Sequence, residues 1–428
     1  MTAKYTDERS GRYLLTMLLA LFVGFGALAA FNFVFDPYDT FFPDSPQEGL
    51  WQYRDRLPRR NTASLNQGGQ YDAMIMGSSR ARFGYDPNHE TWEGYRPMNA
   101  GMAGTTVYEQ ERILLHALEN QPELRRVLYL PDFFTYNNFS KAPMQMDYEQ
   151  SLFYPDLNLG EYYLKALFGM DSTVHAGRMF RRWWYNLEIG ANDQGFHVGR
   201  PRDYYREAVR LGVHAYLFFR QFYGGWEYPV DRMEHFESII QICRENDIEL
   251  FIAIPPIHAT QMESIWQIGL WDEFERWKWE LMQIVNESNE AHPEGQKIPI
   301  WDFTGYSKFT TERVPRVWWS RHVMHYFRDS NHSSILTGRF VMSRIFDYAN
   351  EDVRYDPEWG FRMEDPDEML QHLLDIRAAR RAYHQLDPWE VGWVRMMVED
   401  VTDEKFYNPG GQTGVAGARG VFPMGIVE

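Results

Sequence analysis

The chain has 428 residues, of which 44% are hydrophobic and 16% aromatic, so it is long and apolar enough to bury a large core. Its net charge of −17, without a basic stripe, argues against nucleic-acid binding, because an acidic surface repels a phosphate backbone. The single cysteine, Cys243, excludes an intrachain disulfide and the motifs of zinc-ribbon, iron–sulfur and covalent-haem proteins. It lies in an amphipathic pattern that predicts a buried structural thiol. We expect no cofactor and no metal site.

The first segment with a strong pattern is "LLTMLLALFVGFGALAAFNFVF" (14–35), which contains no charged residue. At about 1.5 Å per residue, such a helix would extend about 33 Å, which is enough to span a bilayer core. Basic residues precede it and acidic residues follow it, so the positive-inside rule predicts a cytoplasmic N-terminus and an extracytoplasmic main domain. Residues 1–36 are therefore predicted to be a cytoplasmic tip and transmembrane anchor. The alternative is a signal peptide cleaved at "ALA" (27–29).

Residues 37–70 are predicted to be a linker, with "RLPRRNTASLNQGG" as a loop. Strand and helix patterns then alternate through a predicted domain at 71–351. The predicted strands are 72–77, 97–104, 125–134, 248–256 and 297–303. The predicted helices are 106–120, 230–246, 271–290 and 333–351. Apolar strands alternating with helices predict the α/β class, with a parallel sheet flanked by helices.

Two segments depart from this alternation. Residues 136–229 are rich in aromatic residues and mostly helical in pattern. We interpret them as a helical insertion that is either additional core or a lid over one end of the sheet. Residues 352–428 are predicted to be an acidic C-terminal extension with one helix at 366–384, and they have the composition of an appendage that docks elsewhere.

Three short motifs fall at the carboxyl ends of strands or just before the last helix, where sheets of this type bind ligands. "GSSR" (77–80) follows the first strand and exposes a serine at a strand-to-helix turn. "NAGMAGTT" (99–106) follows the second strand, and its glycines let a backbone N–H approach an oxyanion. "RDSNHSS" (328–334) contains an Asp-x-x-His turn, in which a carboxylate can orient an imidazole. Each motif alone also suits an ordinary turn or helix cap.

The order of these three motifs resembles that of the SGNH/GDSL hydrolase superfamily over residues 70–350. The resemblance implies a flavodoxin-like α/β fold. It also implies a catalytic triad in which Ser79 is the nucleophile, His332 the base and Asp329 the acid. Ser79 corresponds to the last residue of the family's Gly-Asp-Ser block, in which a serine here replaces the aspartate.

The resemblance also implies the donors of an oxyanion hole. These are the backbone N–H of the nucleophile and that of Gly104, with Gly101 as the alternative. The family's third block, Gly-x-Asn-Asp, is replaced here by "LPDFFTYNN". Either Asn137 or Asn138 supplies the missing donor, or Asp132 occupies the site in a different role.

Three further residues lie close to these motifs in the sequence. Arg80 and Arg82 flank the predicted nucleophile and are candidates to hold an anionic substrate, with surface ion pairs as the alternative. His258, in "PPIHATQ" at the end of the fourth strand, is a candidate substrate contact.

An anchor followed by "FDPYDTFF" and a GSSR block is similar to envelope SGNH-like proteins that work beside membrane-bound O-acyltransferases. Examples are the alginate O-acetylation proteins and the D-alanyl transfer protein of teichoic acid synthesis. This similarity implies an acyltransferase or esterase that acts on acyl esters of an envelope polysaccharide. The enzyme would face the periplasm from the bacterial inner membrane, beside a multi-span membrane protein.

Two alternatives remain open at this point. The domain is catalytically degenerate and serves as a binding or assembly subunit of a membrane complex, or it binds carbohydrate through the aromatic insertion. The second of these requires an exposed aromatic platform.

Overall fold

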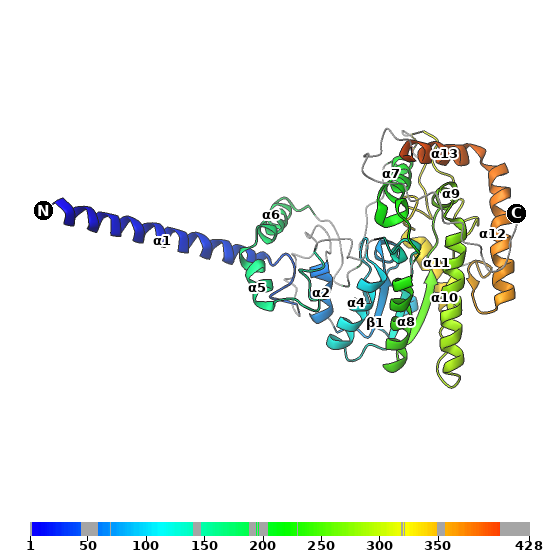
Figure 1. Cartoon of the computed structure of the whole chain (residues 1–428), viewed down its shortest axis with the longest axis horizontal. Coiled ribbons are helices and arrows are strands. Elements are labelled where there is room, and N and C mark those ends of the chain that lie inside the picture. The colour runs from blue at the N-terminus through cyan, green and yellow to red at the C-terminus, as the bar shows by residue number, and fades with distance from the viewer. Residues whose placement is uncertain are drawn as a thin grey trace. The chain divides into compact units, whose positions relative to one another are not determined.

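In a computed structural model the chain divides into two compact units. Figure 1 shows the helices and strands of the chain. The N-terminal unit comprises Met1–Gly69 and Asp147–Asp193, and the α/β unit comprises Gln70–Met146 and Gln194–Glu428. The predicted insertion is therefore divided between the two units. The structure describes residues 2–43, 59–68, 70–139, 147–187, 194, 196, 204–228, 230–317, 320, 322–348 and 356–402.

The described residues of the N-terminal unit form four helices. They are α1 (Thr2–Phe35), α2 (Arg59–Gly68), α5 (Leu159–Phe168) and α6 (Met170–Tyr185). Among the described residues, α1 alone is long and apolar enough to cross a membrane, over Ser10–Phe35. This length and composition suit a membrane anchor or a signal sequence.

Helix α2 differs from the sequence prediction, which placed a loop here. Its residues from Arg59 to Asn66 are buried although the segment is mostly polar. The Arg59 N–H donates to Asp147 (2.8 Å), and the Asn61 side chain donates to the carbonyl of Pro37 (2.9 Å). The helix is therefore held by polar partners that are distant in the sequence. Because the segment is mostly polar, it shows no apolar periodicity from which a helix could be predicted.

In the part of the α/β unit that the structure describes, the strands form one six-stranded sheet in the order β2-β1-β3-β4-β5-β6. The strands are β1 (Ala73–Gly77), β2 (Pro97–Asn99), β3 (Arg126–Leu130), β4 (Glu249–Ile254), β5 (Ile300–Asp302) and β6 (Phe361–Arg362). The first five are parallel, and β6 pairs antiparallel with β5. The predicted α/β class is confirmed, and the order of the parallel strands is the flavodoxin-like one. The two-residue β6 was not predicted, because it is too short to show a period.

Helices cover both faces of this sheet (Figure 1). Helices α3 (Ser79–Gly84) and α11 (Ile335–Ile345) share one apolar cluster with alternate residues of the strands, such as Ile75 and Leu128. On the opposite face, Tyr129 of β3 meets Phe236 with 6.1 Å between ring centroids. That face carries α4 (Val107–Asn120), α8 (Val230–Glu245) and α10 (Trp271–Ala291). The four helices predicted for this domain are therefore confirmed, although α11 is shorter than predicted.

Part of the insertion and most of the described extension complete the α/β unit. Helices α7 (Tyr205–Phe218), α9 (Ala259–Gln267), α12 (Pro366–Leu386) and α13 (Pro388–Thr402) belong to it. Val209 and Val213 of α7 pack in one cluster with Val394 and Met397 of α13. The described part of the extension is thus core structure and not an appendage. Residues 403–428, with the glycine-rich segment, lie outside the described residues.

A buried carboxyl at the start of α13 makes a testable contribution to stability. Glu390 accepts hydrogen bonds from Tyr383 (2.5 Å) and from the Val314 N–H (3.1 Å), and burial raises its pKa from 4.5 to about 7. Because the folded state holds this proton more tightly, the contribution of Glu390 to the free energy of unfolding is greatest below pH 4.5 and is lost as the pH rises through about 7. In the wild-type chain the free energy of unfolding should therefore fall by about 3 kcal/mol over this pH range because of Glu390. We expect this fall to be absent in Glu390→Gln.

Denaturant unfolding at pH values between 4 and 8 would measure this slope. The control is Glu399→Gln, which changes an exposed carboxyl on the same helix and should leave the slope unaltered. An unchanged slope in Glu390→Gln would contradict the assignment.

Candidate active site

The turn after β1 places a serine at the start of α3. Gly77 has a φ of 153°, and a Cβ there would lie 2.7 Å from the Leu130 carbonyl oxygen, so the chain requires glycine at this position. Ser78 caps α3 by accepting a hydrogen bond from the Arg80 N–H (3.2 Å). Ser79 is consequently the first residue of the helix, at the carboxyl end of the sheet.

The structure brings the three predicted triad residues together. The Oγ of Ser79 lies 2.8 Å from Nε2 of His332. The Nδ1 of His332 lies 2.9 Å from both carboxylate oxygens of Asp329. If Nδ1 carries the proton, Nε2 is free to accept the serine proton, and the carboxylate stabilises the resulting imidazolium. The arrangement has the geometry of a nucleophile, a base and an orienting acid.

The loop that carries His332 is held by its own hydrogen bonds. Asp329 also accepts from the backbone N–H groups of Asn331 (2.9 Å) and His332 (2.8 Å). The Phe83 ring packs edge-on against the imidazole, with 5.1 Å between ring centroids. The His332 side chain keeps 20% of its surface exposed, so the imidazole is held in place but remains open to solvent.

The loop after β2 lies against the serine turn. The Met102 N–H donates to the Gly77 carbonyl (3.2 Å), and Gly104 adopts a left-handed conformation with a φ of 63°. The Gly101 N–H donates to the Asn99 side chain (3.0 Å) and is therefore already engaged. Gly101 was the alternative oxyanion donor to Gly104, and its N–H is committed to Asn99.

Gly101 matters for packing instead. A Cβ there would lie 2.6 Å from the Arg82 nitrogen and 2.9 Å from the Ser78 carbonyl oxygen, neither of which can move independently of the backbone. We expect Gly101→Ala to lower the free energy of unfolding by about 1–3 kcal/mol. Gly392→Ala is the matched control, because no atom lies within 4 Å of its Cβ position. Denaturant melts that give equal stabilities for the two variants would contradict this prediction.

A buried ion pair joins Arg80 to Asp132, which lies in the segment "LPDFFTYNN". Asp132 is fully buried, and Nη1 of Arg80 donates to it at 2.5 Å. The Ser78 hydroxyl donates to the other carboxylate oxygen, and Nη2 of Arg80 donates to Asn331 (3.1 Å). Burial raises the pKa of Asp132, whereas the charge of Arg80 and the Ser78 hydrogen bond oppose this rise.

Arg80 therefore joins the serine turn, the end of β3 and the triad loop. This position differs from the predicted contact with an anionic substrate, because the guanidinium is only 3% exposed and is neutralised by Asp132. The sequence signal was an arginine next to the serine and an aspartate in the altered third block. Nothing in the sequence linked the two.

Asn137 does not lie in the site as an oxyanion donor. Its side-chain NH₂ donates to the carbonyls of Arg220 (3.1 Å) and Phe222 (2.7 Å). Its side-chain oxygen accepts from the backbone N–H groups of Phe139 and Glu227, both at 3.0 Å. The amide is thus committed to holding the segment after α7, which corrects the prediction for this residue.

His258 and Arg82 are also buried. His258 caps α9, with Nδ1 2.9 Å from the Thr260 hydroxyl and Nε2 2.6 Å from the Glu312 carbonyl oxygen. Burial lowers the pKa of His258 to about 4. Its role in this structure is that of a structural cap and not of a substrate contact. Arg82, in the last turn of α3, is 5% exposed and therefore presents no open surface to an anion.

No protein-family model and no curated protein matches the sequence. One solved structure that matches is described as "The structure of a putative platelet activating factor from Streptococcus pneumonia.". It is 10% identical, covers 68% of this chain and 89% of its own, and gives a TM-score of 0.28. Within the described residues, no group of three or more His, Cys, Asp or Glu could hold a metal ion.

Proposed function

We propose that the chain is a membrane-anchored SGNH-type serine acyltransferase or esterase that acts on acyl esters of an extracytoplasmic polysaccharide. The observation that carries this proposal is the hydrogen-bonded series Ser79–His332–Asp329. Its members lie 253 and 3 residues apart in the sequence. The series is supported by its position, because it lies where the chain leaves the carboxyl end of β1.

The proposed reaction is acyl transfer through a serine ester. His332 takes the hydroxyl proton of Ser79 as the oxygen attacks the acyl carbonyl, and Asp329 stabilises the imidazolium. Backbone N–H groups of Ser79 and Gly104 are proposed to hold the oxyanion. His332 then gives its proton to the leaving alcohol. A sugar hydroxyl or a water molecule, deprotonated by the same imidazole, releases the acyl group and restores the serine.

The proposed location follows from α1. We propose that α1 is retained as an anchor with its N-terminus in the cytoplasm, and that the enzyme works beside a multi-span acyltransferase in the bacterial inner membrane. Retention is supported by a contact of α1 that lies before the alternative cleavage site at 27–29. The ring of Phe25 meets that of Phe168 with 6.2 Å between ring centroids.

Covalent labelling tests the proposal. A fluorophosphonate probe should label the purified full-length chain, and Ser79→Ala should abolish the label. Ser78→Ala is the control, because it removes the adjacent hydroxyl and leaves Ser79 in place; circular dichroism would verify that both variants fold. Labelling that persists in Ser79→Ala, or no labelling of the wild-type chain, would contradict the proposal.

A second function is favoured by the altered third block. The Asn137 amide is engaged elsewhere and does not provide the third oxyanion donor, and Asp132 of this segment is paired with Arg80. Loss of one such donor lowers the rate by about 10²–10³. The second proposal is therefore a catalytically degenerate domain that serves as an assembly or binding subunit. An unreactive Ser79 in a folded chain would favour it.

A further inference from the structure

Helices α5 and α6 form a hairpin with an exposed apolar face. The large side chains on this face are at least 41% exposed, and we define the apolar hairpin face by six of them: Leu159, Leu164, Phe168, Met170, Trp184 and Tyr185. Soluble surfaces rarely gather this many large apolar side chains in one place. The hairpin belongs to the N-terminal unit and does not include any residue of the candidate active site.

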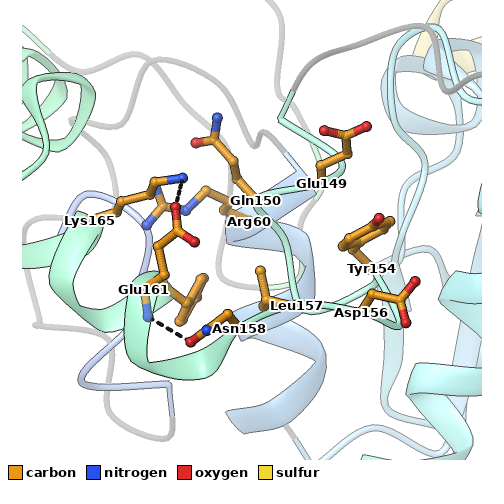
Figure 2. Close-up of a pocket in the computed structure, with 10 residues that line it drawn as sticks. Arg60, Glu149, Gln150, Tyr154, Asp156, Leu157, Asn158, Glu161 and Lys165 are labelled. Carbon is orange, nitrogen blue, oxygen red and sulfur yellow. Dashed lines mark hydrogen bonds and ion pairs between the residues drawn. The ribbon is translucent and has the colours of Figure 1, made fainter.

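Polar side chains lie beside the apolar ones on α5. Asn158 caps α5 through the Glu161 N–H (3.1 Å), and Glu161 pairs with Lys165 at 2.6 Å. Together with Arg60 of α2 these residues line a pocket of about 170 Å³, in which Figure 2 shows the Lys165 side chain directed toward that of Glu161.

The hairpin packs beside the last turns of α1. Phe168 meets Phe25 with 6.2 Å between ring centroids, and Phe180 meets Phe31 and Phe35 at 6.3 Å and 5.8 Å. These partners lie within the apolar span Ser10–Phe35. Phe35 ends the span, and Phe25 lies about 15 Å before that end at a rise of about 1.5 Å per residue. If α1 crosses a bilayer, the hairpin lies level with the outer part of the hydrocarbon core and its boundary with the headgroups.

We propose that the apolar hairpin face inserts into the outer leaflet of the lipid bilayer beside α1, so that the N-terminal unit is attached at two points. Its aromatic end suits the membrane interface, where Trp and Tyr rings are favoured. Helix α6 also carries Arg178, Arg181 and Arg182, which suit anionic headgroups. Continuity with the apolar surface of α1 identifies lipid as the occupant.

A carbohydrate platform fits this face less well. Trp183 and Trp184 are inclined by 65°, whereas a sugar ring stacks on aromatic rings that present a common plane. The face also includes aliphatic side chains such as Leu164 and Met170, which offer no stacking surface. Both features suit acyl chains.

Spin-label accessibility in liposomes tests the proposal. The full chain with Cys243→Ala would be reconstituted in phosphatidylethanolamine–phosphatidylglycerol vesicles, with one nitroxide at Leu164→Cys or Trp184→Cys. Both labels should collide with dissolved oxygen and be shielded from an aqueous nickel chelate. Labels at Asp156→Cys, in the polar pocket, and at Leu386→Cys, an exposed apolar position of the α/β unit, should be open to the chelate.

The inference rests on the anchor assigned in the proposed function, so a label at Val23→Cys in α1 separates the two. A shielded Val23 with hairpin labels open to the chelate would overturn lipid insertion and retain the anchor. This result would favour a protein or carbohydrate partner for the hairpin. A Val23 label open to the chelate would overturn both. None of these readings depends on the reactivity of Ser79.

Discussion

Ser79→Ala is expected to lower the turnover of a p-nitrophenyl acyl ester by a factor on the order of 10⁴–10⁶. The serine oxygen is the nucleophile of the proposed reaction, and alanine leaves only the oxyanion donors and substrate binding. Steady-state kinetics on the purified full-length chain, corrected for spontaneous hydrolysis, would measure the loss in kcat.

A double-variant comparison makes this prediction sharper. Because Ser79 and His332 act as one unit, His332→Ala should cost a similar factor, and the double variant should lose little more than either single variant. Ser78→Ala serves as the comparison, since its hydroxyl bonds Asp132 and not the imidazole. Multiplicative losses in the double variant would indicate that the two side chains act separately.

Asp132→Ala is expected to lower the free energy of unfolding by about 3–5 kcal/mol. The variant leaves the guanidinium of Arg80, which is 3% exposed, without its carboxylate in a buried site. Denaturant unfolding monitored by tryptophan fluorescence would measure the loss. Activity should also fall, because Arg80 holds Asn331 in the triad loop (3.1 Å).

Two comparisons test the physical reason for this loss. Glu207→Ala breaks an exposed pair with Arg210 (2.6 Å) and should change stability by no more than about 1 kcal/mol. Arg80→Met combined with Asp132→Ala removes the unpaired charge and should recover part of the stability. Equal losses for Asp132→Ala and Glu207→Ala would show that the buried pair makes no special contribution.

The local pattern of the sequence predicted the elements that carry their own periodicity. The apolar run at 14–35 predicted α1, because about twenty consecutive apolar residues without a charge are typical of a membrane-spanning helix. The short apolar runs predicted the five parallel strands, and residues spaced at three and four predicted the helices that cover them. The motifs also named Ser79, Asp329 and His332 before any distance was known, and their catalytic roles stay predictions.

Only the tertiary structure decided which side chains meet. Arg80 and Asp132 are 52 residues apart, and Arg80 and Asn331 are 251 apart, so no local pattern could show that the arginine is buried among them. The polar helix α2 and the short strand β6 likewise exist through distant partners. His258 and Asn137 are residue types that often occur in active sites. In the folded chain both are buried and hydrogen-bonded to backbone carbonyls outside the candidate site. Periodicity is a property of a segment, whereas burial and pairing are properties of the folded chain.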